Sequence, residues 1–213
     1  MKKLFLLILI LFGGLKLYSQ HTIGISGGIH YNKPIFLVVK APPSIVMAKV
    51  EKPAMGHQYY ISHSFPIKKI EGMHLTNSLG YMNKGHNYVA NSPFGKQRIH
   101  YLAWSFTPEY RLLENFGIFL GTNINFLLDE YMIAKDGERI LLSKRPNNWK
   151  PANMELSLNM GISINYKIYH LKLGYMPGLT NYYTKNNRYT LITDLESRMY
   201  YVSLGIDLHT FKK

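Results

Sequence analysis

The stretch Met154–Tyr166, MELSLNMGISINY, decides the fold because its residues alternate without interruption. Its even positions carry Met, Leu, Ile and a final Tyr, whereas its odd positions carry Glu, Ser, Asn and Gly. This period of two predicts a β-strand with one apolar and one polar face. About 13 residues at roughly 3.3 Å each, tilted near 45°, span roughly 30 Å, the thickness of a bilayer's hydrocarbon core. Because the polar side chains are mostly small and uncharged, we interpret the segment as a membrane-spanning strand around an enclosed polar lumen.

The N-terminus has the pattern of a secretory signal peptide. Two lysines precede the apolar run Leu4–Phe12, and a short polar exit follows at Ser19-Gln20. We therefore expect residues 1–19 to be a signal peptide and residues 20–213 to form one barrel domain. The chain contains no cysteine, so no disulfide can hold an exported fold together.

Seven further segments alternate in the same way. Since no run of 18 apolar residues follows the signal, any membrane span must be made by strands, and such strands must close into a barrel. The sequence thus predicts an all-β fold, an eight-stranded antiparallel up-and-down transmembrane β-barrel. The expected strands are 22–31, 57–66, 72–82, 98–108, 116–126, 154–166, 169–175 and 200–209.

The segments between these strands alternate in length. The long ones are 32–56, 84–97, 129–152 and 177–197, and short turns separate the other strand pairs. An up-and-down barrel with long loops on one side predicts this rhythm, and with eight strands both termini fall on the short-turn side. The first long segment contains Pro34, Pro42, Pro43 and Pro53, so we expect a loop there.

The chain is strongly basic. Its formal charge of +13 falls to +10 when Lys2, Lys3 and Lys16 of the signal peptide are removed. The cations are dispersed and no nucleic-acid-binding motif is present, so a nucleic acid partner is not expected. We expect the basic residues of the first two loops to face lipopolysaccharide phosphates or an acidic protein partner. These residues are Lys33, Lys40, Lys49, Lys52, Lys96 and Arg98.

Four segments resemble a known family. They are LGYMNKG at 79–85, YLAWSFTPEY at 101–110, FGIFL at 116–120 and LGYMPGLT at 173–180. Together with a signal ending in Ser19-Gln20, they are similar to the outer-membrane β-barrel family widespread in Bacteroidota, which includes PorT-like proteins. The resemblance implies a small barrel of the OmpX type in the bacterial outer membrane. It marks strands and turns and implies no active site. From the alternation of connection lengths, we expect both termini in the periplasm.

Seven ionisable residues fall on the predicted inner face: His74, Glu109, Glu155, His170, Lys172, Asp207 and His209. Because isolated charges are costly in an enclosed interior, we expect them to form a network of ion pairs and hydrogen bonds that fills the lumen. A ligand-binding or proton-linked lumen is the alternative. The nine histidines are spaced singly and Ser and His fall mainly on the lumen face, so no metal, cofactor or enzymatic activity is expected.

Three interpretations of the function stay open at this point. The first is a non-enzymatic, monomeric surface protein that acts through its loops. The second, implied by the resemblance, is a PorT-like component of a protein-export or envelope-assembly system, with envelope or secretion proteins as partners. The third is a soluble periplasmic lipocalin-like barrel, in which the apolar faces would point inward.

Overall fold

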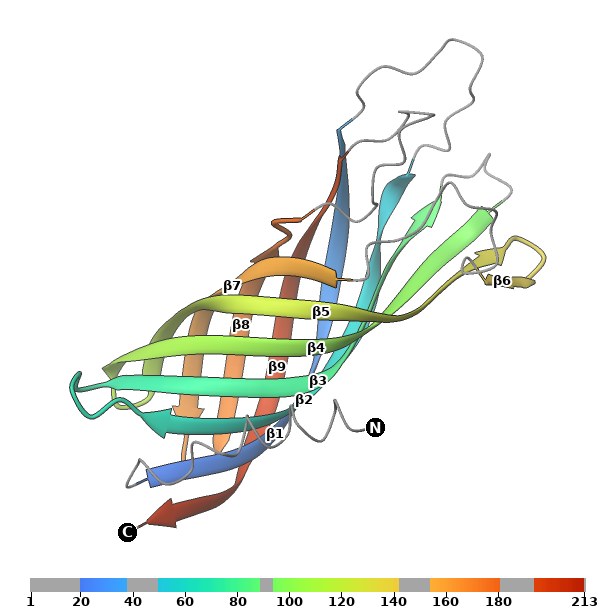
Figure 1. The fold of residues 1–213 in the computed structure, drawn as a ribbon. Coiled ribbons are helices and arrows are strands. Elements are labelled where there is room, and N and C mark those ends of the chain that lie inside the picture. The colour runs from blue at the N-terminus through green and yellow to red at the C-terminus, as the bar shows by residue number, and fades with distance from the viewer. Residues whose placement is uncertain (1–19, 38–49, 89–93, 142–153, 181–193, 213) are drawn as a thin grey trace.

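The strands form one closed barrel. The structure, a computed structural model, describes residues 20–37, 50–88, 94–141, 154–180 and 194–212. Eight strands pair with their neighbours in a ring of antiparallel ladders, and the pairing of β4 with β5 closes it (Figure 1). The strands are β1 (Gln20–Leu37), β2 (Val50–Pro66), β3 (Met73–Tyr88), β4 (Phe94–Leu113), β5 (Phe116–Ala134), β6 (Arg139–Leu141), β7 (Met154–Tyr166), β8 (Tyr169–Pro177) and β9 (Asp194–Lys212). The short β6 pairs only with the end of β5, as a hairpin outside the ring.

The apolar faces of the strands point outward. In β7, Ser157 and Ser163 are fully buried, whereas Ile164 is 43% exposed. The same alternation runs around the wall, for example at Ile61 of β2 and Leu204 of β9, which are 58% and 65% exposed. An apolar exterior of this kind stabilises a protein in hydrocarbon and destabilises it in water. The predicted orientation of the faces is therefore confirmed, and the lipocalin-like alternative, which requires the opposite orientation, is wrong.

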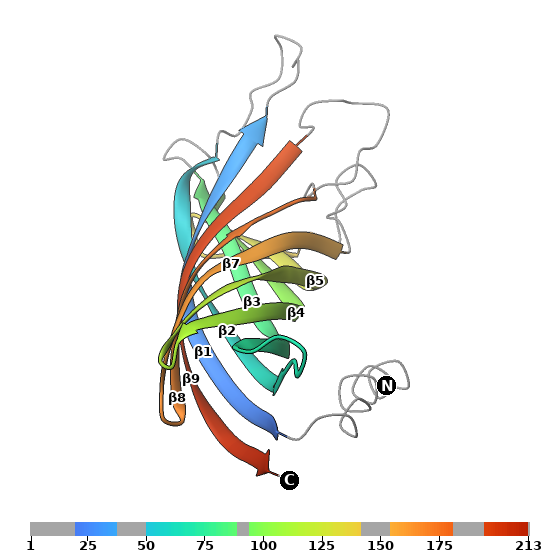
Figure 2. The ribbon, with the colours of Figure 1, turned by 90° about the vertical axis from the view of Figure 1, so that its left-hand side faces the viewer.

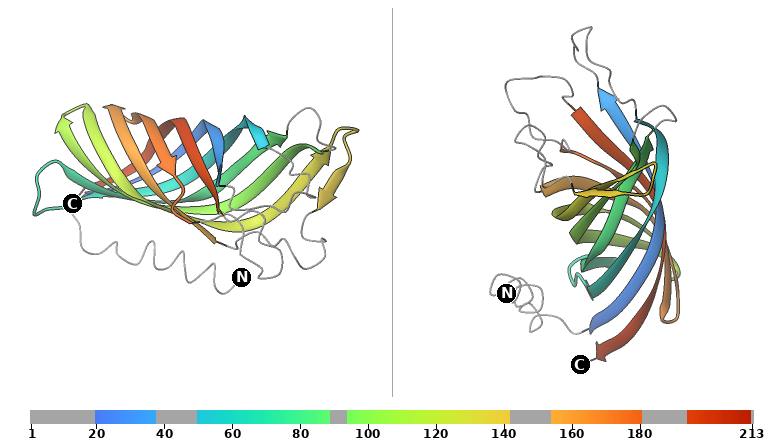
Figure 3. Two further views of the ribbon diagram at one scale, coloured as in Figure 1. Left: turned by 90° about the horizontal axis from the view of Figure 1, so that it is seen from above. Right: turned by 90° about the vertical axis from the view of Figure 1, so that its right-hand side faces the viewer.

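The ring has two different ends. Three short turns, at 67–72, 114–115 and 167–168, lie at one end, together with the first residue of β1 and the last of β9 (Figure 1). The β5–β6 hairpin and the other strand ends lie opposite. The strands run obliquely around the wall, with the strong tilt that closure of an eight-stranded barrel requires (Figures 2 and 3). We refer to these ends as the short-turn end and the long-connection end.

Most strands extend further toward the long-connection end than predicted. The ladder continues to Leu37 in β1 and begins at Val50 in β2, so the expected loop at 32–56 is wrong over much of its length. Pro34 and Pro53 are accommodated within these strands, and the register shifts between Pro53 and His57. A bulge is a position where a strand tolerates proline, which explains why Pro53 does not end the ladder. Pro34 lies beyond the last β1–β2 pair, Asn32 with Ala54, so it is paired on one side only, with β9. β3, β4 and β5 likewise continue into segments that we expected to be loops.

Strand β7 has the bounds predicted for it, Met154–Tyr166. The predicted signal peptide, residues 1–19, lies outside the described residues. No helix long and apolar enough to cross a bilayer occurs in the part of the chain that the structure describes.

Candidate functional site

The lumen near the short-turn end holds a charged cluster centred on Glu109 of β4. Its carboxylate accepts hydrogen bonds from Ser163 Oγ at 2.8 Å and Asn165 Nδ2 at 3.3 Å, both on β7. The Lys172 ammonium of β8 lies 3.5 Å from Glu109 Oε2, and Arg111 Nε lies 3.9 Å from Oε1. The bonds to β7 and β8 join strands that are not neighbours of β4 in the ring, so Glu109 links β4 to these two strands across the lumen.

A second pair lies in the same region. His170 Nδ1 of β8 is 3.7 Å from Asp207 Oδ1 of β9. His74 of β3 lines the same space. Six of the seven predicted lumen residues therefore face inward, and five of them meet at the short-turn end: His74, Glu109, His170, Lys172 and Asp207.

The seventh prediction, His209, is wrong. In the β1–β9 ladder Gly24 pairs with Asp207 but Ile23 pairs with His209, so Leu208 is an extra residue in β9. This bulge reverses the alternation beyond Asp207. His209 is exposed and does not line the cavity.

Glu155, the remaining predicted lumen residue, lies in a separate site nearer the long-connection end. Its carboxylate is 2.6 Å from the Lys84 ammonium of β3, and the two side chains are 4% and 2% exposed. Ser197 Oγ donates a second hydrogen bond to Glu155, at 3.0 Å. A neighbouring hydrogen bond joins Gln97 to Glu130, both buried.

The sequence reasoning missed Lys84, Gln97 and Glu130 because it placed them in loops. The signal that could have revealed Lys84 is the continued alternation of Met82, Lys84 and His86 beyond the predicted end of the strand. All three of these side chains are buried.

A layer of large apolar side chains separates the two polar regions of the lumen. Tyr201 of β9 anchors it, with its hydroxyl donating to Asn159 Oδ1 at 2.7 Å. Phe119 of β5 belongs to this layer. The layer consists of Met82, Ile99, Tyr101, Ala103, Phe119, Met176, Met199 and Tyr201.

A cavity of about 380 Å³ lies below this layer. It extends from the exposed turn residues Glu114 and Lys167 up to Phe119, Met176 and Tyr201. Lys84 and Glu155 do not line it, so it ends at the apolar layer. The wide lumen near the short turns is thus open to solvent at one end and closed at the other.

The outer wall carries a belt of aromatic and polar rings toward the long-connection end. Side by side across β2, β3, β4 and β5, the rings of His57, Tyr81, His100 and Tyr131 follow one another with centroids 5.8, 5.7 and 5.4 Å apart. The hydroxyl of Tyr81 is also hydrogen bonded to His100 Nδ1. We call these four residues the ring belt.

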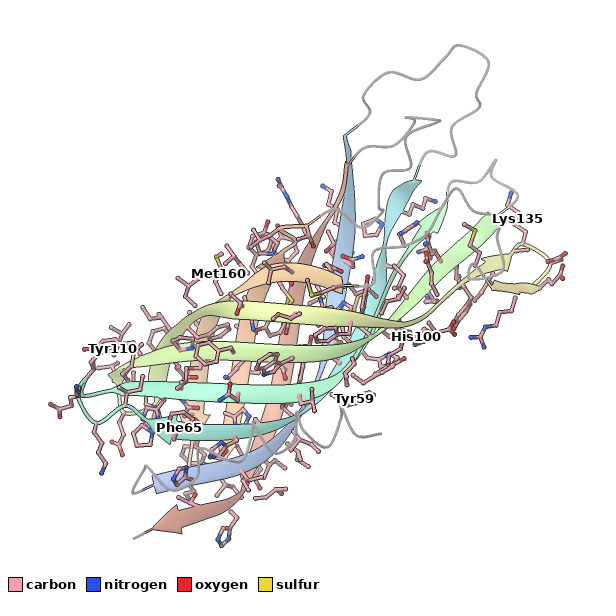
Figure 4. All side chains as sticks on the ribbon, viewed as in Figure 1. Tyr59, Phe65, His100, Tyr110, Lys135 and Met160 are labelled. Atoms are coloured by element: carbon pink, nitrogen blue, oxygen red, sulfur yellow. The ribbon has the colours of Figure 1, made fainter. Side chains whose placement is uncertain are left out.

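The ring belt marks one edge of the apolar wall. In Figure 4, Tyr59 and His100 lie well away from the short-turn end, whereas Phe65 and Tyr110 of the same two strands lie near it. Aromatic residues at both edges of an apolar band are typical of a barrel in a bilayer. His57 and His100 therefore lie on the outer wall, whereas the sequence predicted histidines mainly on the lumen face.

A cation completes the ring belt. The Arg139 guanidinium of β6 lies 3.7 Å from the centroid of the Tyr131 ring and 2.8 Å from Asp129 Oδ2. Lys52 and Lys96 are exposed further toward the long connections, and Arg98 is half-buried. These residues and Lys33 lie in strands rather than in the predicted loops; Lys40 and Lys49 lie outside the described residues.

Neither a metal-ligand cluster nor a nucleophile beside His100 occurs among the described residues. No group of three or more His, Asp or Glu side chains within them is placed to hold a metal ion. The side chains that contact His100 are Tyr81, Asn83 and Tyr131, and none of these is a serine or cysteine nucleophile.

Two solved structures share this architecture. Neisserial surface protein A matches with a TM-score of 0.55 and 11% identity, covering 87% of this chain and 97% of its own. The chain has the fold of the small eight-stranded outer-membrane barrels. The outer membrane protein OprG from Pseudomonas aeruginosa matches with a TM-score of 0.51 and 11% identity, covering 92% and 97%. No family model and no curated protein sequence matches the chain.

Proposed function

We propose that this chain is a monomeric, non-enzymatic barrel of the bacterial outer membrane that acts at the cell surface through its long-connection end. The observation that carries the proposal is that apolar side chains lie outside and polar ones inside a closed ring, the opposite of a water-soluble barrel. A closed barrel is the only way in which strands can cross hydrocarbon with every backbone group paired.

The orientation of the barrel in the membrane follows from the different lengths of the connections at its two ends. Outer-membrane barrels place short turns in the periplasm and longer connections outside. The short-turn end would therefore face the periplasm, together with both ends of the described barrel. The ring belt and its cations would then lie at the outer leaflet, where lipopolysaccharide presents phosphate groups.

The ring belt supports lipopolysaccharide as the lipid partner. Arg139 is held in place by the Tyr131 ring and the Asp129 carboxylate, and it keeps a 54% exposed side chain. Guanidinium groups bind phosphate through paired hydrogen bonds, and Arg98 and Lys96 add positive charge nearby. The belt would bind lipid phosphate with Arg139 while its rings rest at the interface.

Membrane fractionation combined with gel mobility tests the location. We expect the protein in the outer-membrane fraction, with a mobility that shifts when the sample is boiled. Recovery in the soluble periplasmic fraction, with no shift, would overturn the proposal.

Lipopolysaccharide binding is tested separately on folded protein in phospholipid vesicles. We expect added lipopolysaccharide to raise the thermal unfolding temperature, and Arg139→Gln to remove much of that rise. Lys68→Gln, at the short-turn end, is the matched control and should retain it. An equal response of both variants would exclude the belt as the binding surface.

The PorT-like role in export or envelope assembly, which the sequence resemblance implies, stays a prediction. It requires envelope or secretion proteins that co-purify with the folded barrel and a secretion defect when the gene is deleted.

A further inference from the structure

The cavity at the short-turn end has a balanced set of charges. Three cationic side chains line it, namely Arg111, Lys167 and Lys172, and three carboxylates, namely Glu109, Glu114 and Asp207. Lys172 and Arg111 both form ion pairs with the Glu109 carboxylate, and Asp207 faces His170. A ligand with a net charge would displace water from the cavity and leave one charge there without a partner, which is costly once the water is gone. The charge balance therefore favours an uncharged ligand.

The rest of the lining is rich in hydroxyl groups. Ten serine and threonine side chains line the cavity, contributed mainly by β1, β2, β3, β4 and β9. Each hydroxyl can donate one hydrogen bond and accept others, and the carboxylates and guanidinium add strong acceptors and donors. Such a lining can satisfy many ligand hydroxyls at once.

The closed end of the cavity adds two further features. Gln58 is 2% exposed and lines the cavity, and no donor among the described residues lies within hydrogen-bonding distance of its Oε1. A buried carbonyl oxygen without a donor favours a ligand that supplies one. Beside it, Phe119 and Tyr201 present aromatic rings, which pack well against the C–H face of a ring-shaped molecule.

From these observations we infer that the cavity is a binding site for a small, uncharged polyhydroxylated molecule, a monosaccharide or cyclic polyol. Its volume of about 380 Å³ is within the range of small-molecule sites, and an eight-stranded barrel has room for one such ligand. The ligand enters from the short-turn end and stops at Phe119 and Tyr201. Under the proposed orientation that entrance faces the periplasm, but the binding site itself does not depend on the orientation.

Calorimetric titration of the folded full chain tests this inference. The detergent should be an amine oxide, since maltosides carry a sugar headgroup. D-glucose, D-galactose and myo-inositol are the neutral probes, and D-glucosamine, protonated at pH 6, and D-gluconate are the comparators with a net positive and a net negative charge. We expect saturable binding of at least one neutral probe and at least tenfold weaker binding of both comparators. Binding of no neutral probe, or tighter binding of glucosamine or gluconate, would overturn the inference.

Two adjacent substitutions locate the site. Ser62 lines the cavity, so Ser62→Phe should abolish binding by filling it, whereas Ile61→Phe, on the outer wall, should leave it unchanged. Gln58→Leu should weaken binding up to about tenfold through loss of one hydrogen bond. The boiling-dependent gel shift of each variant reports folding independently. If Ser62→Phe folds and still binds the probe, the site lies elsewhere.

Discussion

The two halves of the lumen compensate their buried charges in different ways. Near the long-connection end, Lys84 and Glu155 form a short ion pair that is almost fully buried. Near the short-turn end, Glu109 shares its charge between Lys172 and Arg111, which are 20% and 37% exposed and line a solvent-open cavity. One half is packed against the apolar layer, and the other has room for water or a ligand.

The polar lumen is therefore not uniform in packing or in access to solvent. Burying a charge is costly in both halves, but only the packed half has to compensate it entirely with protein groups. The same residue types therefore have a structural role on one side of the layer and are available for binding on the other.

The largest effect is expected for Lys84→Met. It leaves the Glu155 carboxylate buried without its cation, which should lower the free energy of unfolding by about 3–5 kcal/mol. Urea unfolding in lipid vesicles measures this loss. The double variant Lys84→Met/Glu155→Leu should recover most of it, because both charges are then removed. A loss below about 1 kcal/mol would show that water reaches the packed half.

The next effect concerns the apolar layer. Phe119→Ala should lower the free energy of unfolding by about 3 kcal/mol, because it leaves a cavity in the layer. The same urea unfolding in lipid vesicles measures this loss. Leu120→Ala, on the lipid-facing side of the same strand, is the control and should lose clearly less, because it leaves no cavity inside the barrel. An equal loss in both variants would contradict a packed apolar layer.

A smaller effect is expected on the open side. Glu109→Gln removes the charge that Lys172 and Arg111 share, but both cations can turn toward solvent in the cavity. The free energy of unfolding should therefore fall by only about 1 kcal/mol. If the loss matches that of Lys84→Met in the same urea assay, the two halves do not differ as described.

The smallest effect is expected at the turn between β7 and β8. Lys167 has a φ of 55°, a conformation that glycine adopts at lower cost than other residues. Lys167→Gly should therefore raise the free energy of unfolding by about 1 kcal/mol or less. Destabilisation in the urea assay would indicate that the lysine side chain contributes more than its backbone costs.

The inward or outward placement of most wall residues could be predicted, because it depends on a local alternation along each strand. The alternation in Met154–Tyr166 defines the outward and inward residues and even the bounds of β7. The inward placement of Glu109, His170 and Lys172 followed from the same period of two. A bulge interrupts this alternation. Because Leu208 is an extra residue in β9, the alternation predicted the wrong face for His209.

The remainder depends on contacts that no local pattern records. Lys84 meets Glu155 across the lumen, from strands that are not neighbours, so their pairing requires the closure and register of the whole ring. The ring belt requires four strands to bring His57, Tyr81, His100 and Tyr131 to one level. Pro34 and Pro53 predicted a loop, because sequence alone does not show which prolines a bulged ladder tolerates.

The most direct test of the account compares Ile61 with Ser62 by fluorescence quenching. The chain contains no cysteine, so Ile61→Cys or Ser62→Cys can each be labelled with one bimane group in phospholipid vesicles. We predict that brominated acyl chains quench the label at position 61, and that only aqueous iodide quenches the label at position 62. The reverse pattern, with lipid quenching at 62 and none at 61, would contradict the assignment of an apolar exterior and a polar lumen.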